Sequence, residues 1–347
     1  MTANAAAASL DFDLRDLIDG AVLLASTANA VMQLARPAVG YGVLESTVES
    51  GKTMRHPFRR IRNTITYVSV ALMGTEEERA YYRRQVNRSH ALVRSAADSP
   101  VSYNAFDPRL QLWVAACLYR GGLDVHSRLH GPPDEATADA IYRECRRLGT
   151  TLQVPEHMWP ADRAAFDRYW ASAMAELRID PPVRDYLDRL MMLDYLPRPF
   201  GTALGPVNRF LTTGFLPPPF REQMQLHWTE RDQRQFDFLI QVVASVNRLL
   251  PAPVSRFPFN ASLQDLRLQM MRNRLMQLGL TVTPRSVRKT KIFLYQTVCG
   301  THPEPGAPSC FGSAGRHKSR LVSGRLHHLP HRNRAEPPPA RQRSDSS

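Results

Sequence analysis

Apolar residues recur three or four positions apart along most of this chain, up to about residue 284. That spacing places them on one face of a helix, whereas the alternation that indicates β-strands is rare. The clearest segment opens with Asp107, a residue type that caps helices, and Pro108 at the first helical position. Its apolar stripe comprises Leu110, Trp113, Val114, Cys117 and Leu118. We predict that this helix ends at Gly121–Gly122 and that the chain is all-α.

Capping residues mark the boundaries of other helices. Thr75 precedes three glutamates, and the helix dipole favours acidic residues in a first turn. Thr229 and Asp232 have the spacing of a capping box, which predicts a helix that ends before Pro251. A last helix is expected over Leu263–Leu278, before a glycine.

The regular pattern stops near Pro284, and the composition changes there. Residues 285–347 hold 12 Lys and Arg against 3 Asp and Glu, a net charge of +9 out of the total of +13. This segment is rich in Pro, Gly, Ser and Arg, and it has too few periodic apolar residues to offset its ordering entropy. We therefore predict a flexible N-terminus over 1–14, one globular helical domain over 15–284 and a disordered basic tail over 285–347. Such a tail can attract nucleic acid or an anionic membrane, but a solvated end is the favoured interpretation and no specific nucleic-acid partner is expected.

Cysteine usage and the N-terminus bear on the compartment. Four cysteines are too few and too scattered for a disulfide scaffold, which favours a reducing environment. No positive segment precedes an early apolar run, so a secretory signal is not expected. The least polar early stretch, Leu17 to Ala35, carries Asp19, Asn29 and Gln33 and makes a poor spanning helix. These features predict a cytoplasmic protein and leave peripheral membrane contact and the oligomeric state open.

The segment from His56 to Arg94 holds the residues best suited to chemistry. After an arginine-rich start, an apolar helical segment is expected from Ile65 to Met73. On the following helix, Tyr82, Val86, His90 and Val93 are expected to share one face, with Arg94 one turn after the histidine. An inward histidine among arginines suits haem, with imidazole on iron and guanidinium groups on propionates. From spacing alone, however, a buried histidine bonded to a backbone carbonyl is the favoured interpretation.

Four blocks in order along Asp16–Leu250 resemble the MpaB-type oxygenase family, also known as the rubber oxygenase or latex-clearing-protein catalytic domain. The blocks are GVLES, RRIRNTITYVSVALMGTEEERAYYRRQVNRSHALVR, SYNAFDPRLQLWVAACLY and LPPPFREQMQLHW. The resemblance implies an all-α, globin-like fold that holds haem b. It also implies oxygenase activity, since rubber-cleaving members use dioxygen to split carbon–carbon double bonds and the fungal members cleave a prenyl side chain.

The resemblance also implies roles for particular residues. The family's H-A-x-V-R block places the axial ligand of the haem iron on His90 and its arginine on Arg94. Its R-x-x-[KR]-T block falls on Arg60 and Thr64, with Asn63 where a basic residue is usual. A distal base, a glutamate upstream of that block in rubber-cleaving members, falls on Glu45, with Glu49 as the second candidate.

The expected function is that of a haem b-dependent oxygenase that uses dioxygen on an apolar alkene, an isoprenoid or unsaturated lipid. The alternative is a non-catalytic helical protein that binds haem or lipid on the same scaffold. Hydrolase, NTPase and dinucleotide-binding functions lack their sequence motifs.

Two other groups of potential metal ligands were weighed against plainer interpretations. His126 and His130 stand four apart, but the glycines around them favour a surface segment over a ligating helix. A quartet of Cys299, His302, Cys310 and His317 has a spacing that fits no common zinc finger. A surface pair and an unstructured tail are the favoured interpretations.

Overall fold

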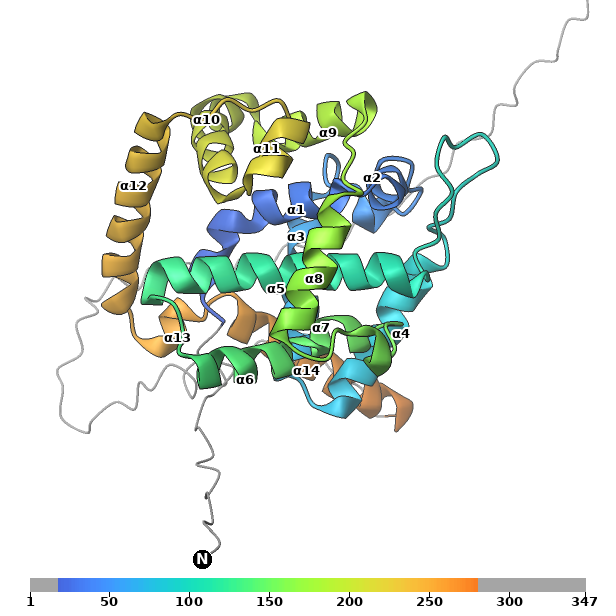
Figure 1. The fold of residues 1–347 in the computed structure, drawn as a ribbon. Coiled ribbons are helices and arrows are strands. Elements are labelled where there is room, and N and C mark those ends of the chain that lie inside the picture. Colours follow the sequence, from blue (N-terminus) through green and yellow to red (C-terminus); the bar gives the residue numbers. More distant parts are fainter. Residues whose placement is uncertain (1–17, 280–347) are drawn as a thin grey trace, which may run out of the picture. The chain divides into compact units, whose positions relative to one another are not determined.

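The computed structural model describes residues 18–279, which all belong to one compact unit (Figure 1). Every regular element in this range is a helix, and the sole strand-like feature there is an antiparallel bridge between Arg94 and Asn104. The all-α prediction is therefore confirmed. The predicted flexible segment 1–14 and basic tail 285–347 lie outside the described residues.

Helices follow one another along residues 18–279. Those of the first half are η2 Gly20–Ala25, α1 Ser26–Leu34, α2 Pro37–Leu44, η3 Glu49–Gly51, α3 Pro57–Met73, α4 Glu76–His90, α5 Pro108–His130, α6 Glu135–Cys145 and α7 Arg147–Thr150. Those of the second half are η4 Glu156–Met158, α8 Arg163–Met174, α9 Pro181–Met191, α10 Arg198–Phe215, α11 Pro218–Gln223, α12 Glu230–Arg248, α13 Ala252–Ser255 and α14 Phe259–Gln277.

The predicted caps are present. Thr75 and Thr229 each form a capping box with the acidic residue three positions on, Glu78 and Asp232. The Asp107 carboxylate accepts a hydrogen bond from the Arg109 amide at 2.8 Å, ahead of Pro108. Each side chain satisfies a backbone N–H that the first helical turn leaves without a partner.

The long helix α5 lies at the centre of the fold, with α8 crossing it on one side (Figure 1). Its Trp113 is fully buried and stacks on Trp170 of α8, with ring centroids 5.3 Å apart. Phe220 of α11 stacks on Trp113 at 6.5 Å, and the Trp113 indole N–H donates to the Gln33 carbonyl of α1 at 3.0 Å. These contacts fix α1, α8 and α11 around α5.

The predicted end of α5 at Gly121–Gly122 is wrong, because the helix continues to His130. Gly121 instead lies where α1 crosses α5. A Cβ added there would stand 2.3 Å from the Asn29 amide nitrogen, and that amide donates to the Cys117 carbonyl at 2.7 Å. The glycine therefore permits close helix packing, at a modest cost in helix propensity.

Two other helices begin earlier in the structure than the sequence predicted. Helix α3 begins at Pro57 rather than Ile65, so its arginines are helical, and α14 begins at Phe259 rather than Leu263. Proline at the first helical position starts α3 because it needs no hydrogen-bond partner there.

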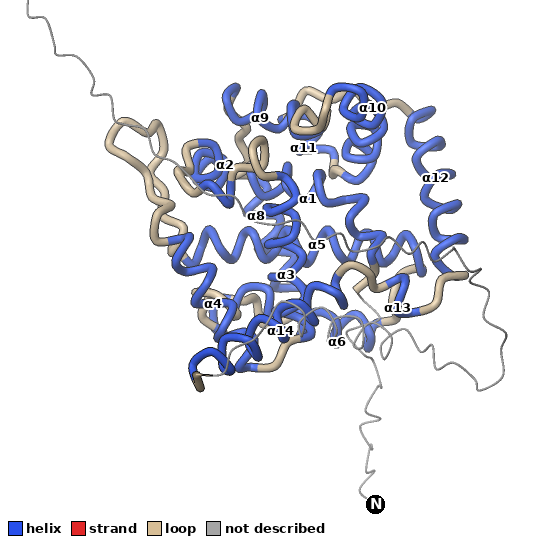
Figure 2. Tube along the Cα trace, turned by 180° about the vertical axis from the view of Figure 1, so that it is seen from behind, coloured by secondary structure: helices blue, strands red, loops and turns tan. Residues whose placement is uncertain are grey.

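Helix α14 packs against the α3–α4 hairpin, as the view from behind shows (Figure 2). Ser69 of α3 donates to the Phe259 carbonyl at 3.1 Å, and Arg267 of α14 pairs with the buried Glu78 of α4 at 2.6 Å. Moving α14 away would leave the buried Glu78 carboxylate without its partner, which costs free energy. This ion pair therefore holds α14 against α4. None of the helices between residues 18 and 279 is long and apolar enough to cross a membrane.

Candidate functional site

A cavity of about 1220 Å³ lies between α2, α3, α4, α5 and α14. Ligand pockets in proteins usually enclose about 300–1,000 Å³, so this one has room for a large cofactor together with part of a substrate. Its inner wall is apolar and comes from α5, from α7 and from the residues just after α7, namely Leu110, Val114, Leu118, Leu148 and Leu152.

Helix α3 runs through the cavity. All ten residues from Phe58 to Tyr67 line it, and ten consecutive helical residues point in every direction around the helix axis. Arg60, Asn63, Thr64 and Tyr67 share one face, which we call the inner face. The Tyr67 hydroxyl on that face donates to the Leu148 carbonyl at 2.5 Å.

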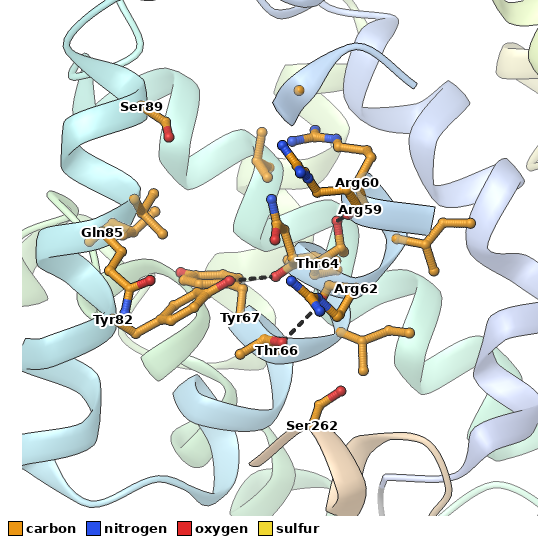
Figure 3. Close-up of a pocket in the computed structure, with 18 of the residues that line it drawn as sticks. Arg59, Arg60, Arg62, Thr64, Thr66, Tyr67, Tyr82, Gln85, Ser89 and Ser262 are labelled. Atoms are coloured by element: carbon orange, nitrogen blue, oxygen red, sulfur yellow. Dashed lines mark hydrogen bonds between the residues drawn. The ribbon is translucent and has the colours of Figure 1, made fainter. Parts of the chain in front are cut away.

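The opposite face of α3, the outer face, carries Phe58, Ile61, Arg62 and Ile65. It continues to Ser69, which bonds the start of α14. The cavity therefore has an inner chamber toward α4 and α5 and an outer groove toward α13 and α14. Figure 3 shows Tyr82, Gln85 and Ser89 of α4 on one side of α3 and Ser262 of α14 on the other.

His90 is the last residue of α4 and lines the cavity. Its Nδ1 atom is buried and has no hydrogen-bond partner. Burial, reinforced by the nearby charge of Arg60, lowers the pKa of His90 to about 4. The imidazole is therefore neutral at physiological pH, the form that binds a metal, and one buried nitrogen is left to bond something other than protein.

Arg60 and Thr64 are brought together with His90 on the cavity wall. Burial lowers the pKa of the Arg60 guanidinium, and the Thr64 hydroxyl donates to the Arg60 carbonyl at 3.2 Å. Asn63 also lines the cavity, and its backbone carbonyl accepts a hydrogen bond of 2.9 Å from the Tyr82 hydroxyl. Burial raises the pKa of Tyr82 to about 12, so the phenol keeps its proton.

The lining is cationic. Its arginines are Arg59, Arg60 and Arg62, and the sole carboxylate that the described residues contribute to it is Asp265. Such an excess of guanidinium groups suits a ligand that carries carboxylates, since arginine pairs with them in bidentate geometry.

Arg94 does not lie where the sequence predicted it. Helix α4 ends at His90, and the chain then pairs with the segment before α5 through hydrogen bonds from Ala105 to Val93 and from Ser95 to Tyr103, both 2.9 Å. Arg94 is consequently exposed and absent from the cavity lining. The expected helical continuation through Val93 is wrong because this pairing replaces it, although Val93 itself lines the cavity.

Glu45 and Glu49 also lie outside the lining. Glu45 follows α2, and its exposed carboxylate accepts a hydrogen bond of 2.8 Å from the Tyr103 hydroxyl. Tyr103 does line the cavity, and burial together with Glu45 raises its pKa to about 12. Glu49 is surrounded by cations, and its hydrogen bond with Lys52 lowers its pKa. Glu45 is therefore linked to the cavity through one phenol, whereas Glu49 belongs to a surface ion-pair cluster.

Gln111 also lines the cavity and was not among the predicted site residues. Gln111 of α5 donates to the Ala105 carbonyl at 2.7 Å and to Gln153 at 2.6 Å, and Gln153 donates to Asn87 of α4 at 2.8 Å. This chain of amides fixes the end of α4 near His90. Gln111 stands beside the predicted apolar stripe of this helix, and a polar residue at the edge of that stripe was the signal available in the sequence.

The other histidine pair has a different setting from the one predicted. Because α5 continues past its glycines, His126 and His130 lie on a helix with ring centroids 5.0 Å apart. His130 Nε2 lies 3.6 Å from Asp19. Across residues 18–279, no group of three or more His, Cys, Asp or Glu residues is arranged to hold a metal ion. The Cys299, His302, Cys310 and His317 quartet lies outside the described residues.

Residues 15–245 match the family described as ER-bound oxygenase mpaB/B'/Rubber oxygenase, catalytic domain. The chain belongs to this family. The resemblance seen in the sequence over Asp16–Leu250 is thereby confirmed, and the chain carries an oxygenase-family domain. Helix α14, which lines the outer groove, lies beyond the matched residues.

Two curated mycobacterial proteins are similar to this chain. They are Uncharacterized protein Mb2261 of Mycobacterium bovis and Uncharacterized protein Rv2237 of Mycobacterium tuberculosis. Each is 52% identical over 252 residues, which cover 73% of this chain and 99% of the relative. No solved structure matches the chain.

Proposed function

We propose that this member of the mpaB/rubber oxygenase family is a haem b-dependent oxygenase, with His90 as the axial ligand. The observation that carries the proposal is the neutral His90 imidazole, whose buried Nδ1 lacks a partner, on the wall of a large cavity. A histidine imidazole is one of the groups with which proteins bind haem iron, and arginines pair with carboxylates such as the haem propionates. When bound, haem supplies the activation of dioxygen.

The residues on the inner face of α3 would hold the haem carboxylates. Arg60 lines the same chamber as His90 and is close enough to influence its pKa. Thr64 lies one turn further along that face. Arg94 is exposed and outside the lining, so we assign the haem carboxylates to Arg60.

The substrate would be an apolar alkene, an isoprenoid or an unsaturated lipid. The leucine and valine side chains of the inner chamber would bind its chain and exclude water. Cleavage of one carbon–carbon double bond by one dioxygen gives two carbonyl groups, so atoms balance without an external reductant.

Glu45 would act as the distal base through Tyr103. The Tyr103 hydroxyl donates its hydrogen bond to the Glu45 carboxylate. When the Tyr103 oxygen takes a proton from the substrate, the hydroxyl can therefore pass its own proton to Glu45. The pKa of Tyr103 is raised to about 12, so the phenol holds its proton at rest and stays hydrogen-bonded to the carboxylate. Since an alkene and dioxygen give two carbonyl groups with no net loss of a proton, the allylic proton that Glu45 takes from the substrate would return to the product.

Glu45→Gln is expected to lower kcat by about 10²–10⁴-fold, the usual contribution of a general base, because the amide cannot accept the proton. Steady-state oxygen consumption measures this effect. The haem absorption of the variant should equal that of the wild type, since Glu45 lies outside the lining. Turnover equal to that of the wild type would remove Glu45 from the mechanism.

The proposed activity can be tested with a matched pair of hydrocarbons. Haem-loaded protein is expected to consume oxygen and form carbonyl products with squalene, and to leave its saturated analogue squalane untouched. Unsaturated and saturated fatty acids form a second pair. Haem-loaded protein that consumes no oxygen with any alkene would contradict the oxygenase proposal.

The alternative is a protein that binds haem or lipid without catalysis. The positions of Glu45 and Arg94 outside the lining favour it. It predicts a haem spectrum with no oxygen consumption, so the same experiment separates the two. A cytoplasmic location is part of our proposal, because the free Cys117 and Cys145 thiols agree with a reducing compartment.

A further inference from the structure

The outer groove of the cavity opens through exposed apolar side chains. Phe58 is 75% exposed and Ile61 39%, both on the outer face of α3, while Val254 of α13 and the following Phe257 are each 54% exposed. All four line the cavity. We call these four residues the apolar rim. Large exposed apolar groups gathered at a cavity mouth usually mark a surface that binds something.

The rim also carries positive charge. Arg59 and Arg62 are exposed, line the same cavity, and alternate with Phe58 and Ile61 along one turn of α3. Guanidinium groups beside aromatic and aliphatic side chains are the composition of surfaces that lie in a membrane interface. Phosphate groups of anionic lipids would pair with the arginines.

We propose that the apolar rim docks this protein on the surface of an anionic lipid bilayer. Phe58, Ile61, Val254 and Phe257 insert among the acyl chains near the headgroups, and Arg59 and Arg62 bind lipid phosphates. The contact is peripheral, because none of the described helices can cross a membrane. Its purpose rests on the proposed function: an apolar substrate would pass from the bilayer into the cavity without crossing water.

A second copy of the chain fits this surface less well. A two-fold interface brings the same patch of each copy together, so the arginines of one rim would lie against those of the other. Like charges brought together in this way oppose association. An anionic bilayer satisfies both the apolar and the charged groups of the rim.

The test measures binding of the full chain to vesicles by co-sedimentation. Vesicles of phosphatidylcholine with phosphatidylglycerol are compared with phosphatidylcholine alone. The double variant Phe58→Ala/Phe257→Ala is expected to bind the anionic vesicles about tenfold or more weakly than the wild type, through loss of buried apolar area. The matched control is Phe200→Ala/Phe238→Ala, which removes two equally exposed phenylalanines, 60% and 69%, from α10 and α12 away from the cavity.

A charge-reversal variant, Arg59→Glu/Arg62→Glu, provides a second readout. It is expected to lose binding to anionic vesicles, and circular dichroism melting verifies that each variant is folded. All variants keep the same basic tail, so differences between them report the rim. Equal binding by the rim variant, the control and the wild type would overturn the proposal, as would a wild type that binds no vesicles.

The outcome is independent of the proposed oxygenase function, because sedimentation requires no turnover. If the protein binds vesicles but consumes no oxygen, the docking surface is supported and the oxygenase proposal is contradicted. If the protein consumes oxygen but does not bind vesicles, the oxygenase proposal is supported and the docking surface is contradicted.

Discussion

Trp113→Ala is expected to lower the free energy of unfolding by about 3–5 kcal/mol, the range found when a buried aromatic residue is truncated to alanine. Trp113 has no exposed surface and touches elements from both halves of the chain. Truncation removes the stacking with Trp170 and Phe220. It also removes the ring that the Arg36 guanidinium covers at 5.2 Å, and it leaves the Gln33 carbonyl without its hydrogen-bond donor. Marginal stability makes a loss of this size visible in expression and melting.

Denaturant unfolding followed by circular dichroism measures the effect. Trp113→Phe is the matched control, because it keeps an aromatic ring in the core and removes chiefly the indole hydrogen bond and some volume. We expect it to cost less than half as much as the alanine variant. If the alanine variant were as stable as the wild type, the central position of α5 in the fold would be wrong.

His90→Ala is the second large effect, and it concerns the cofactor. The variant should lose stoichiometric haem b while it keeps its fold, because His90 sits at the end of α4 and is only partly buried. Alanine removes the nitrogen proposed to bond iron and leaves the arginines of the lining intact. The remaining apolar and ionic contacts would hold haem weakly and without an axial protein ligand.

The matched control is His157→Ala, at an exposed histidine in η4 that does not line the cavity. It should bind haem like the wild type. Adding imidazole to His90→Ala should restore part of the binding, because a free ligand can replace the missing side chain. This rescue separates the loss of a ligand from a general loss of structure.

Much of the fold was predictable because its signals are local. The capping boxes at Thr75 and Thr229 depend on residues three positions apart, and both are present. The end of α5 was not predictable, since the role of Gly121 depends on Asn29, which lies far earlier in the chain. The glycine pair favours the end of a helix by local propensity, but the packing of α1 against Gly121 lets α5 continue to His130.

The candidate site divides in the same way. His90, Arg60 and Thr64 all line the cavity, and their roles toward a cofactor, which the resemblance implied, stay a prediction. Arg94 does not line the cavity, because its segment pairs with the segment before α5 and α4 ends at His90. Helical spacing cannot reveal a pairing of this kind. The walls from α13 and α14 were also missed, because they follow the blocks that carried the resemblance.

The most direct test of the account is the absorption spectrum of the purified wild type and of His90→Ala, each titrated with haem b. We predict a Soret band that saturates at one haem per chain in the wild type and in His157→Ala, and a shifted, non-saturating band in His90→Ala. Identical spectra and stoichiometry for wild type and His90→Ala, or no specific binding by the wild type, would contradict the assignment of His90 as the iron ligand.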